Sequence, residues 1–193
     1  PPEHIFACAK NWDKLRGNTE PRGMVPCRDG LETVGRSDVV IAAVKPYLME
    51  EVLFPLREAL RGKTVLTVAA GWGFARMEAL LGSQVPHLSI MPNTPVSVCE
   101  GVVLLEEEHS LSGEAYAQVT ELLSALGAVQ AVPADKMSIA GTLSGCGPAY
   151  AAMFLEALGD AGVLHGLPRE LSYRLAAQML AGTGKLQLET GQH

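Results

Sequence analysis

Four short segments of this 193-residue chain combine small residues with polar ones in a way that suits ligand binding. Three of them, residues 43–46, 68–71 and 91–95, each follow a run of apolar residues. Glycine, alanine and proline at such places end a strand and let a ligand approach the backbone closely. The fourth segment, residues 143–150, opens a long apolar stretch. Together they predict a binding site for a small molecule.

Two polar side chains indicate which chemistry the first three segments would serve. The ammonium group of Lys45 could lie near a phosphate or a ribose hydroxyl. The Asn93 amide offers both a donor and an acceptor, which suits a carboxamide such as that of nicotinamide. Each segment alone is also typical of an ordinary strand-to-helix turn. Three such turns at successive strand ends favour a ligand-binding site over ordinary turns.

The fourth segment has the pattern of a helix start that binds an anion. Ser144 can cap the helix, Gly145 and Gly147 expose backbone N–H groups, and Pro148 suits the first turn. Backbone donors at a helix N-terminus bind anions, and a carboxylate is the expected guest. A plain helix start is the alternative. Cys146 has no base nearby, so we interpret it as a small filler residue rather than a nucleophile.

Alternating strand and helix patterns indicate how these segments are positioned. Residues 39–44 are apolar at six consecutive positions, which predicts a strand buried on both faces of a parallel sheet. Further strands are expected at 5–8, 64–68, 87–91, 102–105 and 129–132. Helices are expected between them: one with Leu48, Val52, Leu53, Leu56 and Leu60 on one face, one marked by Met77, Leu80 and Leu81, and one from the N-cap Ser112 to the C′ residue Gly127. Such βαβ units bind ligands at the carboxyl ends of their strands.

The pattern changes after about Lys136, where strand signals end. Two long helices are expected, at roughly 147–163 and 168–188. Both are apolar over most of their circumference, so they must be buried on several sides. A partner subunit is therefore expected; the alternative is that they pack back onto the sheet domain.

Composition excludes several classes of protein. The net charge of −6 argues against nucleic-acid binding. The four cysteines form no CxxC pair and have no histidine at metal-ligand spacing, so reduced thiols and no metal are expected. No apolar run reaches the ~18 residues of a membrane span, and the N-terminus has no signal-peptide pattern. We therefore expect a cytoplasmic protein without a membrane partner.

In this order and spacing, the four segments resemble the pyrroline-5-carboxylate reductase family. The family has A-V-K-P, then A-A-G, then M-x-N-T-P, then L-S-G-S-G-P-A-Y. This chain has the first three intact and the fourth with Cys146 at the middle serine. Residues 156–163 and 166–169 are also similar to the family, so the resemblance covers nearly the whole chain.

The resemblance implies an α/β fold, with a Rossmann-like parallel-sheet domain (residues 1–133) followed by an all-helical dimerisation and substrate domain (residues 134–193). It also implies a homodimer, or a higher oligomer built from dimers. The implied reaction is hydride transfer from NADPH, or possibly NADH, to the imine carbon of 1-pyrroline-5-carboxylate, giving L-proline in the last step of proline biosynthesis.

Site residues follow from the resemblance position by position. The expected cofactor-binding residues are Cys8, Lys10, Asn11, Asp29, Ala43, Val44, Lys45, Pro46, Ala69, Ala70, Asn93, Thr94 and Pro95. The expected substrate-binding residues are Ser144, Gly145, Gly147 and Pro148. Lys10 would favour a 2′-phosphate and hence NADPH. No catalytic residue is assigned.

The chain also departs from the family pattern. It lacks the family's N-terminal Gly-rich phosphate turn and its later S-P-G-G-T-T segment, and Ser138 stands where aspartate is usual. We expect the natural gene product to be longer at both ends. Two alternatives remain: another two-domain NAD(P)-dependent dehydrogenase acting on hydroxy acids, and a non-catalytic dimerising module. The absence of lysine from 147–163 counts against the first.

Overall fold

A computed structural model describes residues 1–192. Its strands are β1 (Phe6–Ala7), β2 (Val25–Pro26), β3 (Val39–Ala42), β4 (Thr64–Thr67), β5 (His87–Pro92), β6 (Gly101–Glu106) and β7 (Gly127–Val132). Its α-helices are α1 (Trp12–Thr19), α2 (Gly30–Gly35), α3 (Met49–Leu53), α4 (Phe74–Leu81), α5 (Gly113–Ser124), α6 (Met137–Gly141), α7 (Gly147–Leu164) and α8 (Arg169–Thr190). Short 3-10 turns include η3 (Pro46–Leu48), η4 (Phe54–Leu56) and η5 (Thr94–Val98), and η7 (Thr142–Cys146) is a π-helical turn.

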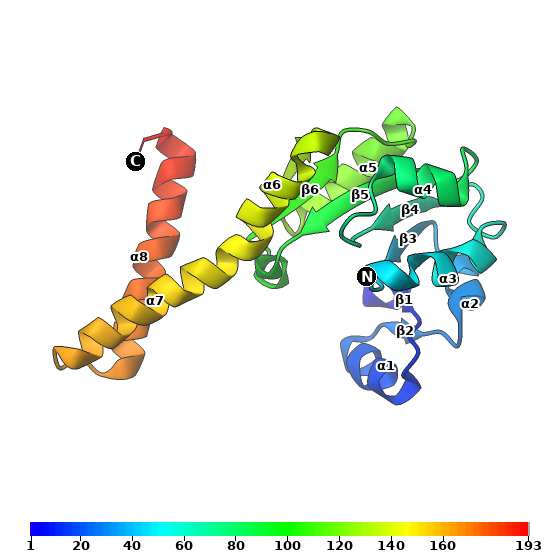
Figure 1. The fold of residues 1–193 in the computed structure, drawn as a ribbon. Coiled ribbons are helices and arrows are strands. Elements are labelled where there is room, and N and C mark those ends of the chain that lie inside the picture. The colour runs from blue at the N-terminus through cyan, green and yellow to red at the C-terminus, as the bar shows by residue number, and fades with distance from the viewer. Residues whose placement is uncertain (193) are drawn as a thin grey trace. The chain divides into compact units, whose positions relative to one another are not determined.

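The chain divides into two compact units, Pro1–Gly141 and a second that begins at Thr142. The first unit holds a parallel pair, β1–β2, and a five-stranded sheet in the order β3–β4–β5–β6–β7 (Figure 1). Strands β3, β4 and β5 are parallel, as expected for βαβ units. Strand β6 runs antiparallel to β5. The reason is the connection over residues 93–100, which is too short for a parallel crossover.

Two apolar clusters cover the two faces of the five-stranded sheet. One gathers around Met49, Leu53, Trp72 and Met77, from α3, α4 and the turn before α4. The other packs Val119 and Leu123 of α5 against β4, β5 and β6. The expectation that β3 is buried on both faces was wrong, because Ile41 is 51% exposed. β3 lies at the edge of the five-stranded sheet, and on the α5 side only its first residue, Val39, packs against the apolar cluster.

The helix expected around Leu48–Leu60 is broken. It is divided into η3, the five-residue α3 and η4, and Val52 is partly exposed whereas Leu53 and Leu60 are buried. Pro55 explains the end of α3, because proline lacks the N–H that would continue the α-helical hydrogen bonds after Phe54. The fragments still present Met49 and Leu53 to the core.

The helix after Ser112 begins as expected and ends earlier. The Ser112 side chain accepts a hydrogen bond from the Ala115 N–H, 3.2 Å away, which makes it the N-cap of α5. The C-cap is Ala125, so Gly127 is not the C′ residue but the first residue of β7. Its φ of 135° and its close approach to Gly101 both require glycine.

The second unit contains α7 and α8, with bounds close to those expected. The chain reverses at Gly166 (φ 91°), and α8 turns back and packs against α7 (Figure 1). Ser172 of α8 donates a hydrogen bond to the Gly159 carbonyl of α7, at 2.7 Å. A Cβ on Gly159 would overlap Tyr173, and one on Gly162 would overlap Ser172. The two helices therefore depend on these glycines to approach each other.

Large apolar side chains face outward on both helices. Tyr150, Met153, Phe154 and Leu164 of α7 are each more than half exposed, and so are Leu175, Leu186 and Leu188 of α8. Burying this surface would release water and stabilise the helices. Within residues 1–192, no helix is long and apolar enough to cross a membrane.

Candidate active site

The carboxyl ends of β3, β4 and β5 meet at one edge of the sheet. Ala42, the last residue of β3, pairs with Thr67, the last residue of β4, and Thr67 pairs with Ser89 of β5. β5 then continues to Pro92. The three segments at 43–46, 68–71 and 91–95 therefore leave the sheet at the same edge, as the sequence predicted.

The Ala43–Pro46 segment is open to solvent. Ala43 and Lys45 are exposed, whereas Val44 is half-buried against the α3–α4 cluster. Lys45 has an extended backbone and precedes η3, whose first residue is Pro46. Val44 thus anchors the turn in the core while the Lys45 ammonium group remains available to an anion.

Two hydrogen bonds fix the Val68–Gly71 turn, and they involve the residues just before and just after it. The Ala69 N–H donates to the Thr67 hydroxyl at 3.1 Å, and the Trp72 Nε1–H donates to the Pro46 carbonyl at 2.8 Å. Trp72 is fully buried, so this bond ties two of the predicted ligand-binding turns together. Between them Ala70 and Gly71 are exposed, with Gly71 at φ 75°. Small exposed residues beside a rigid turn fit a flat cofactor ring packed against the backbone.

Asn93 has a structural role that the sequence did not reveal. Its side-chain Oδ1 accepts a hydrogen bond from the Val102 N–H at 2.9 Å, and its backbone N–H donates to the Val102 carbonyl at 3.2 Å. The side-chain acceptor that was expected to face a carboxamide is therefore used to close the β5–β6 connection. That bond holds η5, which presents Thr94 exposed and Pro95 half-buried.

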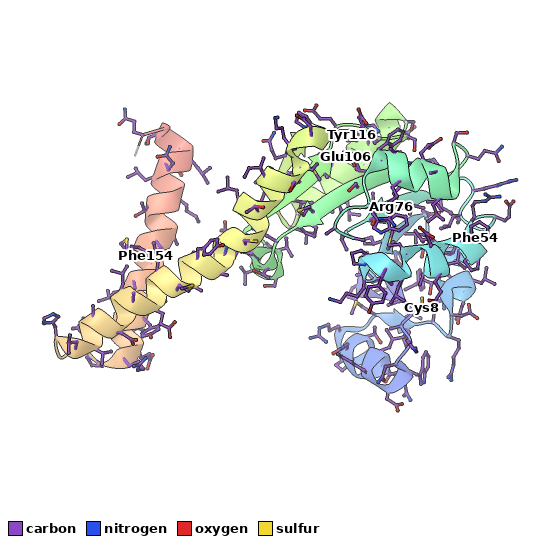
Figure 2. All side chains as sticks on the ribbon, in the orientation of Figure 1. Cys8, Phe54, Arg76, Glu106, Tyr116 and Phe154 are labelled. Atoms are coloured by element: carbon purple, nitrogen blue, oxygen red, sulfur yellow. The ribbon has the colours of Figure 1, made fainter. Side chains whose placement is uncertain are left out.

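The residues expected on the adenosine side follow β1 and β2, whose carboxyl ends also share one edge. Cys8 is exposed (Figure 2), and so is Lys10. Asn11 is the N-cap of α1 and accepts from the Lys14 N–H at 2.9 Å. Asp29 is the N-cap of α2 and accepts from the Glu32 N–H at 2.9 Å. Both side chains orient the helix that follows each strand.

The fourth segment does not form the helix start that its sequence indicated. Helical structure begins earlier, with α6, and continues through η7 into α7. Ser144 lies inside η7, and α7 has no side-chain cap. The expected N-cap at Ser144 and the free helix N-terminus at Gly145 and Gly147 were therefore wrong. Inside a continuous helix, the N–H groups of Gly145 and Gly147 donate to carbonyls one turn earlier. They are therefore not open to a ligand, as they would be at a true helix N-terminus. A π-helical turn of this kind is often found at functional sites.

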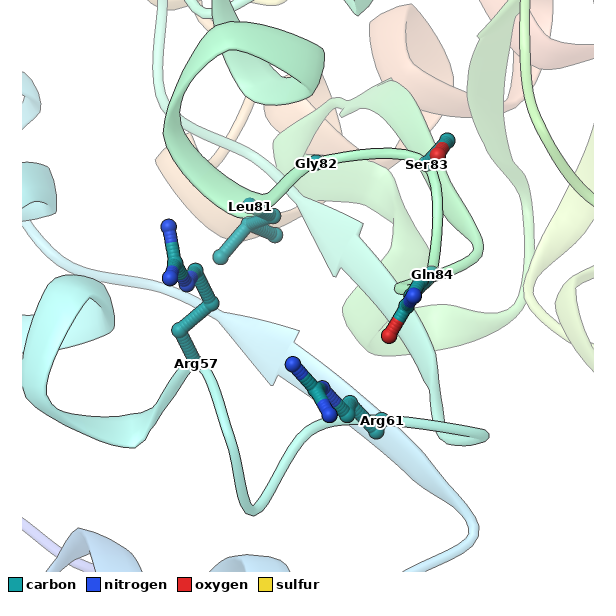
Figure 3. A pocket seen from close by; sticks show the side chains of 6 residues that line it. All are labelled: Arg57, Arg61, Leu81, Gly82, Ser83 and Gln84. Carbon is teal, nitrogen blue, oxygen red and sulfur yellow. The ribbon is translucent and has the colours of Figure 1, made fainter.

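A shallow hollow of about 200 Å³ lies elsewhere (Figure 3). Its walls come from the segments that precede β4 and β5, at the opposite ends of these strands from the predicted site. Arg57 and Arg61 line it, and both pair with Glu58. Within residues 1–192, no three His, Cys, Asp or Glu side chains are placed to hold a metal ion.

Comparisons with known proteins find relatives of both parts of the chain. Residues 134–193 match the family model described as pyrroline-5-carboxylate reductase dimerisation, and residues 2–71 match one described as NADP oxidoreductase coenzyme F420-dependent. Pyrroline-5-carboxylate reductase of Treponema pallidum is 39% identical over 193 residues, covering 98% of this chain and 73% of that protein. The Escherichia coli enzyme is 31% identical, covering 100% and 72%.

The chain belongs to the pyrroline-5-carboxylate reductase family. A crystal structure of Plasmodium falciparum pyrroline carboxylate reductase with NADP bound has a TM-score of 0.88 to this chain, at 29% identity, covering 100% of this chain and 71% of that one. Membership confirms the expected fold class, the expected enzyme class and the NAD(P)H cofactor. The dimerisation match also indicates a homo-oligomer.

Two residues important to this site were not found from the sequence. Trp72 reads as one more apolar residue, and Glu106 as the first of three acidic residues that follow a strand. Both act through partners far along the chain, Trp72 at Pro46 and Glu106 at Phe74. No local pattern marks such a contact.

Proposed function

We propose that this protein reduces 1-pyrroline-5-carboxylate to L-proline, the last step of proline biosynthesis, with NADPH as its preferred hydride donor and NADH as a second one. One observation carries the proposal. Three family motifs leave β3, β4 and β5 at a single sheet edge, where open α/β sheets bind dinucleotides.

In this proposal each of the three turns contacts a different part of the cofactor. Val44 and Lys45 border its ribose and phosphates, with Ala43 and Pro46 setting the path of the backbone. Ala69 and Ala70 pack beside the ribose and the nicotinamide. Thr94 and Pro95 border the nicotinamide ring, and Asn93 holds the connection that presents them. The exposure of Lys45, Ala70 and Thr94 supports these roles.

The β1–β2 edge serves the adenosine end. Lys10 pairs with a 2′-phosphate, which is the basis for preferring NADPH. Cys8 lies beside it, and Asn11 and Asp29 orient the loops through their helix caps. The exposure of Cys8, Lys10 and Asp29 supports this assignment.

The bound dinucleotide supplies the hydride, and the protein supplies position and surroundings. The rigid Ala69–Gly71 turn and the η5 turn fix where the ring lies, which makes hydride delivery to a C=N carbon effectively unimolecular. Ser144, Gly145, Gly147 and Pro148 border the imine. These residues lie in or next to a π-helical turn, which supports a role in ligand binding.

The dinucleotide-binding domain spans residues 1–133 and the helical dimerisation and substrate domain spans residues 134–193. The start of the helical family match at residue 134 supports this boundary. We further propose a homodimer, or an oligomer built from dimers, with no nucleic-acid or membrane partner. The four free thiols, at Cys8, Cys27, Cys99 and Cys146, support a cytoplasmic location.

The test is NADPH oxidation by the full-length protein with 1-pyrroline-5-carboxylate, and proline as the measured product. Lys45→Ala should raise the KM for NADPH, whereas Lys63→Ala, a change at the other end of β4, should not. Turnover of 2-hydroxy or 3-hydroxy acids without imine turnover would favour the dehydrogenase alternative. Failure to bind NADPH in calorimetry would favour the non-catalytic module.

A further inference from the structure

Glu106 is a buried carboxylate that the proposed reaction does not use. It is the last residue of β6 and is 5% exposed (Figure 2). The strand register places it next to Ser89 of β5, which in turn pairs with Thr67 of β4. Among the ion pairs formed by residues 1–192, none includes Glu106. A buried carboxylate without a salt-bridge partner is costly, so its hydrogen bonds must be examined.

The carboxylate binds the first turn of α4. Its Oε2 accepts a hydrogen bond from the Phe74 N–H at 2.9 Å, and it also accepts one from Ser89. A Cβ on Gly73 would lie only 3.0 Å from its Oε1, so the glycine leaves space for the carboxylate. Helix α4 has Gly73 as its N-cap residue and no side-chain cap of its own. Glu106 supplies that cap from a strand 32 residues away.

This cap completes a set of three anchors around the Ala69–Gly71 turn. The Thr67 hydroxyl holds the beginning of the turn, and the Trp72–Pro46 bond holds its side. Glu106 holds its end, where the chain enters α4. Removing the last anchor would leave the Phe74 N–H, the first of α4, without this partner and let the turn shift. The turn is where the cofactor ring is proposed to pack, so a small shift there weakens cofactor binding.

We propose that Glu106 is a positioning residue for the cofactor, acting through the α4 N-terminus and the Ala69–Gly71 turn. The inference rests on the proposed function. This role needs a buried hydrogen-bond acceptor at position 106. The side-chain amide oxygen of a glutamine, which is neutral, can also accept that bond.

The test compares three variants of the full-length protein: Glu106→Leu, which removes the acceptor, Glu106→Gln, which keeps it, and Glu107→Leu as the matched control on an exposed neighbour. NADPH affinity is measured by fluorescence titration without substrate, and the KM values for NADPH and the imine are measured separately. Thermal melts give the folded fraction of each variant.

Glu106→Leu should weaken NADPH binding and raise its KM about tenfold, the scale of one hydrogen bond to a charged group. The KM for the imine should change less than twofold, and Glu106→Gln should restore most of the NADPH affinity. Equal NADPH affinity in Glu106→Leu and wild type would overturn the inference, and so would a Glu106→Gln variant as weak as Glu106→Leu.

A Glu106→Leu protein that fails to fold leaves the Glu106→Gln comparison and a second variant, Gly73→Ala, which crowds the carboxylate. Gly73→Ala should also raise the KM for NADPH selectively, and an unchanged KM would contradict the inference. An inactive wild type that binds no NADPH would instead contradict the proposed function, which separates the two failures.

Discussion

At the scale of single residues, this site depends on hydrogen bonds that fix turns. Trp72, Asn93 and Glu106 each pair with a backbone group of another segment. All three hydrogen bonds are at least partly buried and so are shielded from water. A buried backbone group that loses its partner costs more than the bond itself contributes.

Trp72→Phe should destabilise the protein by about 2 to 3 kcal/mol, because it removes the buried indole's hydrogen bond to the Pro46 carbonyl and opens a small cavity. Urea denaturation measures the change. The matched control is Trp12→Phe, in a half-buried ring that stacks under Arg28, and there we expect less than about 1 kcal/mol. Similar losses in the two variants would contradict the importance of the Trp72–Pro46 bond.

Glu106 should also make stability depend on pH. Burial is the largest effect and raises the pKa of this carboxyl above its ordinary value of 4.5, with Glu108 acting in the same direction. The Phe74 N–H, His87 and Ser89 act the other way. A carboxyl whose folded pKa is raised contributes full stability below the unfolded pKa and loses it as the pH rises through the folded pKa.

Glu106→Gln cannot ionise, so its melting temperature relative to wild type should rise from about pH 4 towards neutrality. Thermal melts across that range measure the difference. Glu107→Gln, on the exposed neighbour, serves as the control and should follow wild type at every pH. A constant difference between Glu106→Gln and wild type would refute a raised pKa.

At the scale of elements, helix α7 meets α8 through small residues. Gly162→Ala should destabilise the helical unit by about 1 to 3 kcal/mol, because its Cβ would overlap Ser172. Gly182→Ala is the matched change, since no atom lies within 4 Å of its Cβ. It should stabilise α8 by about 0.5 to 1 kcal/mol. Denaturation curves that shift in the same direction for both variants would contradict this account of the packing.

The broken helix expected over residues 48–60 shows which element predictions fail. Its apolar spacing correctly identified Leu53 and Leu60 as buried residues. The spacing alone could not show that Pro55 divides the segment into short turns. Similarly, the residues of 143–150 were consistent with a helix start, and only the structure showed that helical turns already precede them. A cap pattern specifies a boundary only where the preceding residues are not helical.

At the scale of the whole molecule, the exposed apolar surface of α7 and α8 belongs to the subunit interface of the homo-oligomer in our proposal. Phe154 of α7 is 53% exposed (Figure 2). Phe154→Glu should weaken self-association by about thirtyfold or more, because a charge would then be buried at an apolar contact. Light scattering across a dilution series measures the oligomer. Leu122→Glu makes the same kind of change at a similarly exposed residue of α5 and should leave the assembly intact.

The sequence by itself determined the family, the three turns at one sheet edge, the two long helices and most strands of the first unit, but not β2, α1, α2 or α6. Those properties depend on residue types within a few positions of each other, such as apolar runs that end in Ala, Gly or Pro. Only the tertiary structure decided that Asn93 closes its own turn, that Trp72 joins two turns and that Glu106 caps α4. These bonds join residues 9, 26 and 32 positions apart. They form because strand register brings distant backbone groups within 3 Å, and register is a property of the packed sheet.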